Sequence, residues 1–333
     1  MSTLTENEIR PDDLMPEQEK MLSKDIKRLM QRQGEFVSVS CPACRRTHSR
    51  TIFEKYGLNY DICLECSTVF INPRPTPEIL EDYYSHSLNY KYWSEYIFPA
   101  SEEARRDKIF HPRVEKIIEI CTQYKIEPES LLEVGAGFGT FCEEMRKQNY
   151  FRQIIAIEPT PELAKSCRSK GLRVIEMPVE KVIMEEESIN VIVSFEVIEH
   201  LFCPDSFINS CKQFLKTDGL LILSCPNIQG FDIALLKELS KSIDNEHLNY
   251  FNPNSLSYLL TNNGFDILEI LTPGSLDAEL VRTAVLDGKY DLANQPFLET
   301  LLINRWEELG QAFQTFLVDN KLSSHLWIVA RKK

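Results

Sequence analysis

Two pairs of cysteines near the N-terminus constrain the fold of this chain more than any other sequence feature. The pairs are Cys41-Pro-Ala-Cys44 and Cys63-Leu-Glu-Cys66, with eighteen residues between them. A two-residue gap lets both thiolates of a pair turn toward one point, and two such pairs complete a closed tetrahedron around Zn²⁺. A closed tetrahedron has no open position for water, so the spacing predicts a structural zinc ribbon with Cys41, Cys44, Cys63 and Cys66 as ligands.

Two other interpretations of these pairs explain less. A redox dithiol needs only one pair, and two unrelated buried pairs would not repeat the same spacing. The remaining six of the ten cysteines lie at irregular intervals among apolar residues, so we expect them to pack as small hydrophobic side chains. They are Cys121, Cys142, Cys167, Cys203, Cys211 and Cys225.

Length and charge limit the class of protein. A chain of 333 residues that is 43% hydrophobic and 26% charged has the composition of a globular protein and room for two domains. The net charge of -13 argues against general nucleic-acid binding, because any attraction to phosphates would have to overcome an acidic global field.

The first residues, MSTLTENEIRPDDL, carry acids where a secretory signal has basic residues. No stretch approaches the ~18 apolar residues that a membrane span requires. We therefore expect a cytoplasmic protein with no membrane span, and the sequence leaves its oligomeric state open.

From residue 129 onward, short β-branched runs alternate with helical stretches. This alternation predicts an α/β fold with a doubly wound parallel sheet, whose ligands bind at the carboxyl ends of the strands. The predicted strands are Leu131–Val134, Ile154–Glu158, Arg173–Glu176, Asn190–Phe195, Leu220–Cys225, Phe265–Leu271 and His325–Ala330. Residues 272–322 precede the last strand and contain a long helical pattern from Pro296 to about Asn320, which predicts a helical insertion.

The first of these strands runs into a glycine turn, Gly135-Ala-Gly-Phe-Gly139. The turn lacks both the G-x-G-x-x-G spacing of dinucleotide-binding proteins and the Gly-Lys-Ser/Thr ending of P-loops. Its backbone can approach a ligand closely without presenting a basic residue to phosphate. Glu158 ends the next strand, where a carboxylate can accept hydrogen bonds from ribose hydroxyls. These features favour a nucleoside-bearing ligand without phosphates.

Four motifs in order resemble the class I S-adenosylmethionine-dependent methyltransferase family. They are Glu133-Val-Gly-Ala-Gly-Phe-Gly139, Ile157-Glu-Pro159, Val193-Ser-Phe-Glu-Val-Ile-Glu-His200 and the segment from Leu215 to Asn227. The resemblance implies a Rossmann-like sheet of seven strands, with the last strand antiparallel and inserted between the fifth and sixth.

The resemblance also implies S-adenosyl-L-methionine as a cofactor and assigns its contacts to Glu133, Gly135, Ala136, Gly137, Glu158, Pro159, Val179, Phe195 and His200. In that assignment the glycine turn faces the methionine part, Glu133 supports its amino end, and Glu158 holds the ribose. Val179 lies near the adenine, and Phe195 and His200 shape the site. Ordinary core packing is the alternative for Val179 and Phe195.

The segment Asn245-Glu-His-Leu-Asn-Tyr-Phe251, after the fifth strand, supplies the candidate base. Together with the four-cysteine ribbon and the Asn72-Pro-Arg-Pro75 connector, it resembles zinc-ribbon sugar methyltransferases, which include C-methyltransferases of nucleotide-linked deoxy-keto-sugars. The resemblance implies that Glu246 and His247 lie in the acceptor site, where Asp244, Glu246 and His247 would form a carboxylate-supported base. Those enzymes carry a tyrosine where this chain has Asp244, so C-, N- and O-methylation all stay open.

The sequence therefore predicts four parts. Residues 1–35 form a polar, helical N-terminal segment, 36–72 the zinc ribbon, and 73–128 a connector with helices that cover the cofactor site. Residues 129–333 form the methyltransferase domain, with the insertion at 272–322 as a lid, an acceptor wall or a dimer interface. The predicted function is methyl transfer to a sugar or nucleotide-sugar in surface-polysaccharide or natural-product biosynthesis.

Two alternatives to this function stay open. An RNA methyltransferase could grip RNA through the ribbon, where Arg45, Arg46 and Arg50 cluster, although the rest of the chain has no basic stripe. A non-catalytic scaffold could bind the cofactor without turnover. For a nucleotide-sugar, Arg74 and Arg282 are the candidate cations that meet its phosphates.

Overall fold

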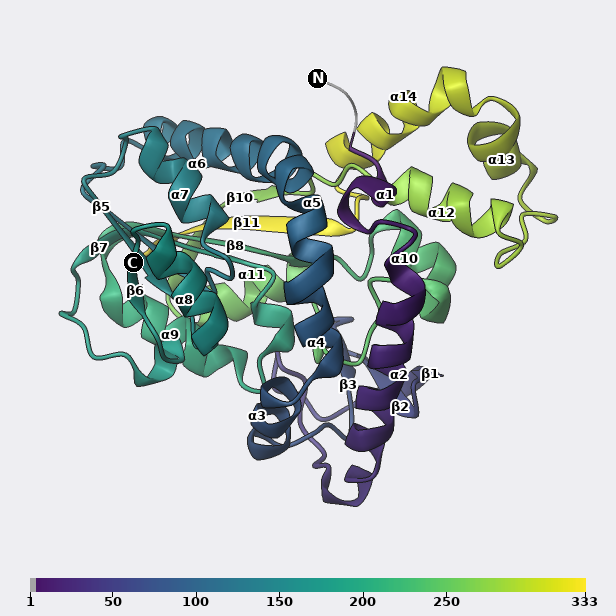
Figure 1. The fold of residues 1–333 in the computed structure, drawn as a ribbon, viewed down its shortest axis with the longest axis horizontal. Helices are drawn as coiled ribbons and strands as arrows, with labels where there is room; N and C mark the ends of the chain where they lie inside the picture. Colours follow the sequence, from purple (N-terminus) through teal and green to yellow (C-terminus); the bar gives the residue numbers. More distant parts are fainter. Residues whose placement is uncertain (1–3) are drawn as a thin grey trace. The chain divides into compact units, whose positions relative to one another are not determined.

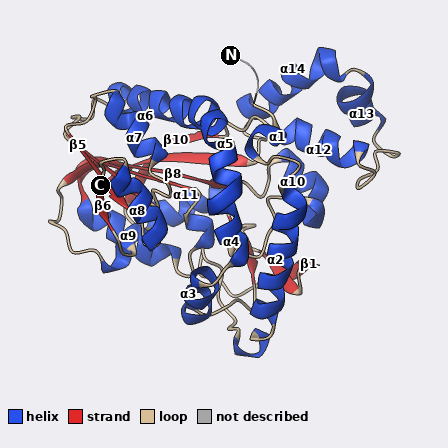
Figure 2. Ribbon diagram, viewed as in Figure 1, coloured by secondary structure: helices blue, strands red, loops and turns tan. Residues whose placement is uncertain are grey.

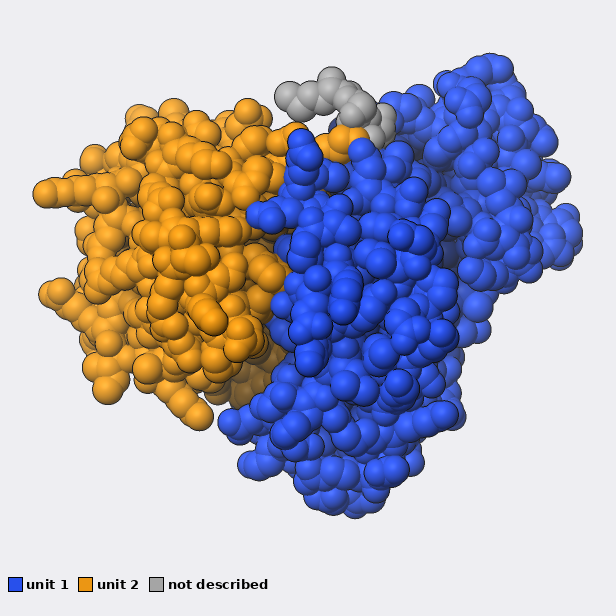
Figure 3. Space-filling model, viewed as in Figure 1, with its two compact units in different colours: residues 1–104, 226–252, 271–326 blue, residues 105–225, 253–270, 327–333 orange. Residues whose placement is uncertain are grey.

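The computed structural model describes residues 4–333, so the first three residues of the predicted N-terminal segment lie outside the described residues. The chain forms two compact units (Figure 3). Unit 1 contains residues 1–104, 226–252 and 271–326, and unit 2 contains residues 105–225, 253–270 and 327–333. Each unit thus combines segments that lie far apart in the sequence.

Unit 2 is built on a seven-stranded sheet in the order β10-β11-β8-β7-β4-β5-β6 (Figure 1). The strands are β4 (Ser130–Val134), β5 (Gln153–Ile157), β6 (Arg173–Ile175), β7 (Ile189–Phe195), β8 (Leu215–Pro226), β10 (Phe265–Leu271) and β11 (His325–Lys332). Strands β6, β5, β4, β7 and β8 pair in parallel. Every residue of β4 and β7 is buried, as expected for central strands covered on both faces.

The last strand runs antiparallel to its neighbours. Past the end of β8, the Asn227 amide donates to the carbonyl of Ser324, just before β11 begins, at 2.8 Å. At the opposite end, Lys332 Nζ donates to the carbonyl of Leu215, the first residue of β8, at 2.6 Å. Lys333 similarly donates to Gly264, just before β10. The predicted fold class, with its last strand antiparallel between the fifth and sixth, is confirmed.

Helices connect the strands of unit 2. The α-helices are α6 (His111–Gln123), α7 (Thr140–Lys147), α8 (Pro161–Ser169), α9 (Pro204–Phe214) and α11 (Pro253–Asn262). Shorter turns are the π-helical η3 (Arg106–Phe110) and the 3₁₀ turns η4 (Val179–Lys181) and η5 (Ile198–His200). Helices α6 and α7 lie on one face of the sheet, and α9 and α11 on the other (Figure 1).

Unit 1 contains a four-stranded antiparallel sheet in the order β1-β2-β3-β9. Strands β1 (Ser49–Lys55), β2 (Leu58–Cys63) and β3 (Val69–Ile71) belong to the predicted ribbon. The fourth strand, β9 (Asn249–Tyr250), comes from the segment that follows β8. The fourth strand of the ribbon sheet therefore comes from the residues that follow His247, the candidate base.

Helices form the rest of unit 1 (Figure 2). Before and after the ribbon they are α1 (Glu6–Ile9), α2 (Met15–Met30), η1 (Gln33–Glu35), α3 (Pro77–Ser85), α4 (Leu88–Tyr92), η2 (Trp93–Ile97) and α5 (Phe98–Arg105). After β8 they are α10 (Phe231–Leu236), η6 (Lys237–Leu239), α12 (Asp277–Leu286), α13 (Pro296–Glu299), η7 (Thr300–Asn304) and α14 (Trp306–Asp319). No helix among residues 4–333 has both the length and the apolar character to cross a membrane.

The insertion before β11 is helical, as predicted (Figure 2). Val281 of α12 and Leu302 of η7 are fully buried and pack with Leu236 of α10 in one apolar cluster. Because these side chains come from three separate helical segments, the insertion and α10 share a core within unit 1.

Candidate functional site

The glycine turn after β4 has a shape that only glycine adopts readily. Gly135, Gly137 and Gly139 have φ values of 81°, 55° and 76°. The backbone amides of Gly135 and Ala136 both donate to the carbonyl of Ile157, at 2.9 and 3.1 Å, which ties the turn to the end of β5. The turn is thereby held at the carboxyl edge of two neighbouring parallel strands, where ligands of such sheets bind.

The glycines differ in what surrounds them. A Cβ at Gly135 would lie 2.4 Å from Cγ2 of Val197, so a side chain there would force Val197 to shift. A Cβ at Gly137 would have no heavy atom within 4 Å beyond its chain neighbours. The turn is therefore packed on one side and open at Gly137, where its backbone can approach a ligand.

Glu158 lies buried directly after β5 and is oriented by the same turn. Its Oε2 accepts from the Gly137 amide at 2.8 Å, and its Oε1 accepts from the Thr160 amide at 2.9 Å. Burial raises the pKa of Glu158 above its ordinary value, against these backbone hydrogen bonds. A carboxylate offers about four acceptor sites, so Glu158 retains capacity for a hydroxyl donor.

Glu133 lies within β4 and is also buried. Cys142 Sγ of α7 donates to its Oε2 at 2.9 Å. Burial raises the pKa of Glu133 to about 8.

Phe195 ends β7 inside an aromatic cluster. Its ring contacts Phe141 edge-on, with centroids 5.0 Å apart, and Trp327 at 5.3 Å. The guanidinium of Arg113, from α6, lies 4.2 Å from the centroid of the Phe195 ring. Arg113 was not predicted from the sequence, because a single arginine in a helix belongs to no recognisable motif.

The other predicted cofactor residues also belong to unit 2. Ala136 and Val179 are buried, Pro159 is exposed, and His200 ends the turn η5. Seven of the nine lie within or directly after β4, β5 and β7, while Val179 and His200 lie in η4 and η5, the turns that follow β6 and β7. The strand registers align Val134 with Ile157 and Ile157 with Ile175. The structure therefore brings them to one edge of the sheet.

The four ribbon cysteines converge. Their Sγ atoms all lie within 4.8 Å of one another, with Cys41 and Cys66 at 3.5 Å and Cys44 and Cys63 at 3.4 Å. Tetrahedral zinc with Zn–S bonds of about 2.3 Å places its sulfurs about 3.8 Å apart, so the cluster is close to the size of a zinc site. Four thiols of this geometry fit a structural zinc ion and leave no ligand position open.

His247 lies in the segment Ser240–Asn252, which we call the 240–252 loop. Asp244 Oδ1 accepts from the backbone amides of Glu246 and His247, at 2.9 and 2.8 Å. His247 Nδ1 lies 3.0 Å from the carbonyl of Ser242 and 3.4 Å from Asp244 Oδ2. Because a carbonyl only accepts, the neutral ring carries its hydrogen on Nδ1 and its lone pair on Nε2. The ring is thus held through Nδ1, beside the Asp244 carboxylate.

Glu246 faces a different set of partners. Its Oε1 accepts from the Tyr83 hydroxyl at 3.2 Å and from Asn89 Nδ2 at 3.3 Å. Burial, followed by the charge of Asp244, raises the pKa of Glu246 to about 7. In unit 1, Asp244 is the carboxylate that lies beside Nδ1 of His247. Glu246 instead belongs to a polar network with Tyr83 of α3 and Asn89 of α4.

The two candidate cations for a nucleotide-sugar do not form a surface site. Arg74 is 1% exposed and donates to the carbonyl of Ile71 and to Asn249 Oδ1, at 3.2 and 3.1 Å. The expectation for Arg74 is wrong, because a guanidinium buried in the ribbon cannot meet an anion from solvent. Arg282 lies over the Trp306 ring, with 5.1 Å to the centroid, inside the insertion.

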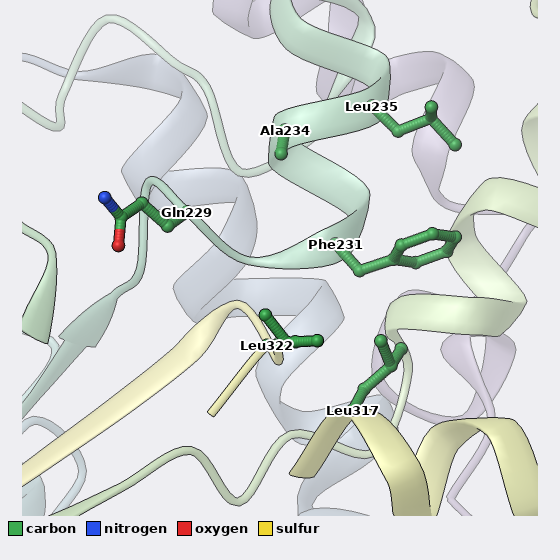
Figure 4. A pocket seen from close by; sticks show the side chains of 6 residues that line it. All are labelled: Gln229, Phe231, Ala234, Leu235, Leu317 and Leu322. Atoms are coloured by element: carbon green, nitrogen blue, oxygen red, sulfur yellow. The ribbon is translucent and has the colours of Figure 1, made fainter. Parts of the chain in front are cut away.

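A pocket of about 270 Å³ lies beside α10 in unit 1 (Figure 4). It is lined by Gln229, Phe231, Ala234, Leu235, Leu317 and Leu322. These six side chains include no acid, base or thiol, so they bring no acid–base chemistry to the candidate site.

Comparison with known families identifies the α/β domain. The family described as "Methyltransferase domain" matches residues 103–270, just over half of the chain. The chain belongs to this methyltransferase-domain family. The matched range contains the glycine turn, Glu158 and all the other predicted cofactor residues.

Curated relatives match parts of the same range. A probable S-adenosylmethionine-dependent methyltransferase of Mycobacterium tuberculosis is 30% identical over 137 residues, covering 40% of this chain and 48% of the relative. A ubiquinone biosynthesis O-methyltransferase of Xanthomonas oryzae pv. oryzae is 34% identical over 106 residues, covering 29% of this chain and 43% of the relative. The chain thus spans about half the length of the curated relatives it matches.

Among solved structures, a SAM-dependent methyltransferase from Archaeoglobus fulgidus aligns over 72% of this chain and 100% of its own, at 17% identity and a TM-score of 0.49.

Proposed function

We propose that this chain is an S-adenosylmethionine-dependent methyltransferase that acts on a sugar or nucleotide-sugar. The observation that carries the proposal is the pairing of an open glycine turn with a buried acid: the Gly137 amide donates to Glu158 at 2.8 Å, next to open space. This arrangement suits a nucleoside that has ribose hydroxyls and no phosphates. Membership of the methyltransferase-domain family supports the same cofactor class.

The nine predicted contacts provide the binding chemistry. When bound, S-adenosylmethionine supplies an electrophilic methyl group on a sulfonium sulfur. The turn from Gly135 to Gly137 lets the backbone approach the methionine part, and Glu158 accepts from the ribose hydroxyls. Arg113 and Glu133 add a guanidinium and a carboxyl to the same part of unit 2.

We assign the base to His247. Nε2 would take the proton of an acceptor hydroxyl, amine or activated C–H group, while the acceptor gains the methyl group and the methyl–sulfur bond breaks. Asp244 fixes the ring and stabilises the imidazolium across 3.4 Å. Most of the remaining rate enhancement would come from alignment of the reacting groups in a site without water.

The sugar acceptor rests on three features that occur together. These are the four-cysteine ribbon, the Asn72-Pro-Arg-Pro75 connector and the Glu-His pair at 246 and 247. We propose a structural role for zinc in the ribbon, and we keep the predicted division at residues 35, 72 and 128 as part of the proposal. A relative named for ubiquinone biosynthesis makes phenolic acceptors a necessary arm of the test.

The test incubates the full chain and methyl-labelled S-adenosylmethionine with a panel of nucleotide-sugars, phenols and RNA. We expect a one-methyl mass gain in a nucleotide-sugar, and the NMR shift of the labelled methyl would identify a C-, N- or O-methyl product. Transfer to phenols or RNA alone would overturn the sugar assignment. Failure to release S-adenosylhomocysteine with any acceptor would favour a non-catalytic scaffold.

A further inference from the structure

The 240–252 loop is hydrogen-bonded along its backbone to the ribbon. Strand β9 pairs with β3, so that Val69 faces Tyr250 and Phe70 faces Asn249. The Ile71 amide adds a hydrogen bond to the carbonyl of Leu248 at 3.0 Å. The chain that directly follows His247 is therefore an edge strand of the ribbon sheet.

Two ribbon side chains hold the loop on the other side of His247. Lys55 Nζ donates to the carbonyls of Ser240 and Ile243, at 2.9 and 2.6 Å. The Tyr60 hydroxyl donates to the carbonyl of Asp244 at 2.6 Å. These bonds flank Ser242, whose carbonyl lies against His247 Nδ1, and fix the backbone of Asp244.

The far end of the 240–252 loop contacts a cysteine of the four-thiol cluster. Asn252 is 1% exposed and its Nδ2 donates to the backbone carbonyl of Cys66 at 2.9 Å. Arg74 links Asn249 to the carbonyl of Ile71 through its buried guanidinium. The position of the loop therefore depends on the conformation of the β2–β3 hairpin, where Cys63 and Cys66 lie.

The ribbon has little apolar packing at β1 and at the tip of the β2–β3 hairpin, since its buried apolar side chains lie in β2 and β3, at Leu58, Tyr60, Val69, Phe70 and Ile71. No residue of β1 is fully buried, and Leu64 between the two hairpin cysteines is 59% exposed. Metal binding in a segment of this kind supplies folding free energy, because the site exists only in the folded ribbon.

We infer that the zinc-loaded ribbon is the template that positions the 240–252 loop, with Tyr60, Lys55 and Asn252 as the positioning residues. The metal would affect the position of His247 only through hydrogen bonds between the ribbon and the loop backbone, and it would not contact the reacting atoms. Only the consequence for turnover rests on the proposed function of His247; the structural coupling does not.

The first experiment measures amide hydrogen exchange on the full chain before and after zinc removal by a chelator, with the metal content checked by elemental analysis. We expect exchange at residues 248–250 to rise at least tenfold, while exchange at the glycine turn and the affinity for S-adenosylmethionine stay unchanged. Unchanged exchange at 248–250 after verified loss of zinc would overturn the inference.

A second experiment avoids metal removal. Tyr60→Phe deletes the hydroxyl that bonds Asp244 and keeps the ring, which stacks on Phe53 at 4.8 Å. Tyr56→Phe is the matched control, because Tyr56 lies on the same ribbon and is 36% exposed. We expect Tyr60→Phe to raise exchange at residues 244–247 and to lower kcat about tenfold, with an unchanged KM for the cofactor.

The outcomes separate the two proposals. If amide exchange rises in Tyr60→Phe but the parent chain transfers no methyl group to any acceptor, the template inference is supported and the proposed function is wrong. Equal exchange in Tyr60→Phe and Tyr56→Phe would remove Tyr60 from the template, whatever the activity.

Discussion

Gly135 and Gly137 need to be glycine for different physical reasons. Gly135 combines a positive φ with direct packing against Val197. Gly137 combines a positive φ with open space and a backbone hydrogen bond to Glu158. The first residue therefore serves the fold, and the second is suited to contact with a ligand.

Gly135→Ala should destabilise the fold. The left-handed backbone costs about 1–2 kcal/mol in a non-glycine residue, and forced overpacking adds about 1–3 kcal/mol. We expect the free energy of unfolding in urea to fall by roughly 3 kcal/mol. A loss below about 1 kcal/mol would show that Val197 moves aside at little cost.

Gly137→Ala should instead weaken cofactor binding. Its new methyl group meets no atom of the protein, so only backbone strain of about 1–2 kcal/mol acts on stability. We expect at least a tenfold weaker Kd for S-adenosylmethionine by calorimetry, because the methyl group occupies the open side of the turn. An unchanged Kd in Gly137→Ala would show that S-adenosylmethionine does not contact the open side of the turn.

His247→Ala should keep cofactor affinity and lose turnover. Removal of a general base typically lowers kcat by about 10²–10⁴-fold. His48→Ala is the matched control, because His48 is an exposed histidine of the ribbon. Single-turnover methyl transfer by both variants, with the acceptor found in the panel, makes the comparison, and equal rates would exclude His247 from the mechanism.

At the scale of elements, the insertion is anchored where α12 begins. Asp277 accepts from the hydroxyls of Ser323 and Ser324, both at 2.7 Å, and from Gln314 Nε2 at 2.8 Å. This carboxylate thus joins α12, α14 and the approach to β11. Asp232 of α10 lies in the same unit, and burial, followed by the charge of Asp277, raises its pKa to about 6.

Asp232 should make stability fall as pH rises. The folded chain holds the Asp232 proton up to about pH 6 and the unfolded chain releases it near pH 4, so the free energy of unfolding declines across this interval. Asp232→Asn should remove this decline, raising stability at pH 8 relative to pH 5 by about 1.4 kcal/mol compared with the parent, since about one pH unit of the decline lies above pH 5.

Urea unfolding of both chains at pH 5 and pH 8 makes this measurement. Asp319→Asn is the control, because Asp319 is exposed at the end of α14. Parallel pH dependences of the parent and Asp232→Asn would show that Asp232 titrates normally.

Most elements could be predicted from local patterns, and the differences have local causes. The strand predicted at Leu220–Cys225 extends to Leu215–Pro226, because the Thr-Asp-Gly sequence at 217–219 resembles a turn but continues the strand with Asp218 at φ 64°. Among the helices predicted for residues 73–128, the π-helical stretch Arg106–Phe110 lies between α5 and α6. Such interruptions depend on hydrogen-bond registers that side-chain periodicity does not encode.

The candidate site was predictable only where residues are close in sequence. Glycine spacing located the turn and Cys-x-x-Cys spacing located the thiol cluster. Asp244 could be proposed as a partner of His247 because it lies three residues away. Tyr60 and Asn252 gave no signal, because long-range pairing of the chain brings them to their partners, the backbone carbonyls of Asp244 and Cys66. Strand β9, with two residues, is too short for any period to be visible.

At the scale of the whole molecule, the metal content is the sharpest test of the ribbon. We expect one zinc ion per chain by elemental analysis, because the four ribbon thiols form one closed cluster. Cys44→Ser should lower the zinc content well below one, whereas Cys203→Ser, at an exposed cysteine outside the cluster, should leave it unchanged. Full zinc retention in Cys44→Ser would contradict the four-thiolate site.

The pairing of β3 with β9 also has a consequence for synthesis of the chain on the ribosome. Strand β3 ends at Ile71 and its partner begins at Asn249, so residues 72–248 must be translated before the ribbon sheet can close. During that interval the edge of β3 is open to wrong partners, as unpaired strand edges are in other nascent proteins. Early zinc binding would keep the nascent ribbon folded while the edge of β3 is unpaired. A ribbon of residues 36–72 grafted onto another protein would lack its fourth strand, β9.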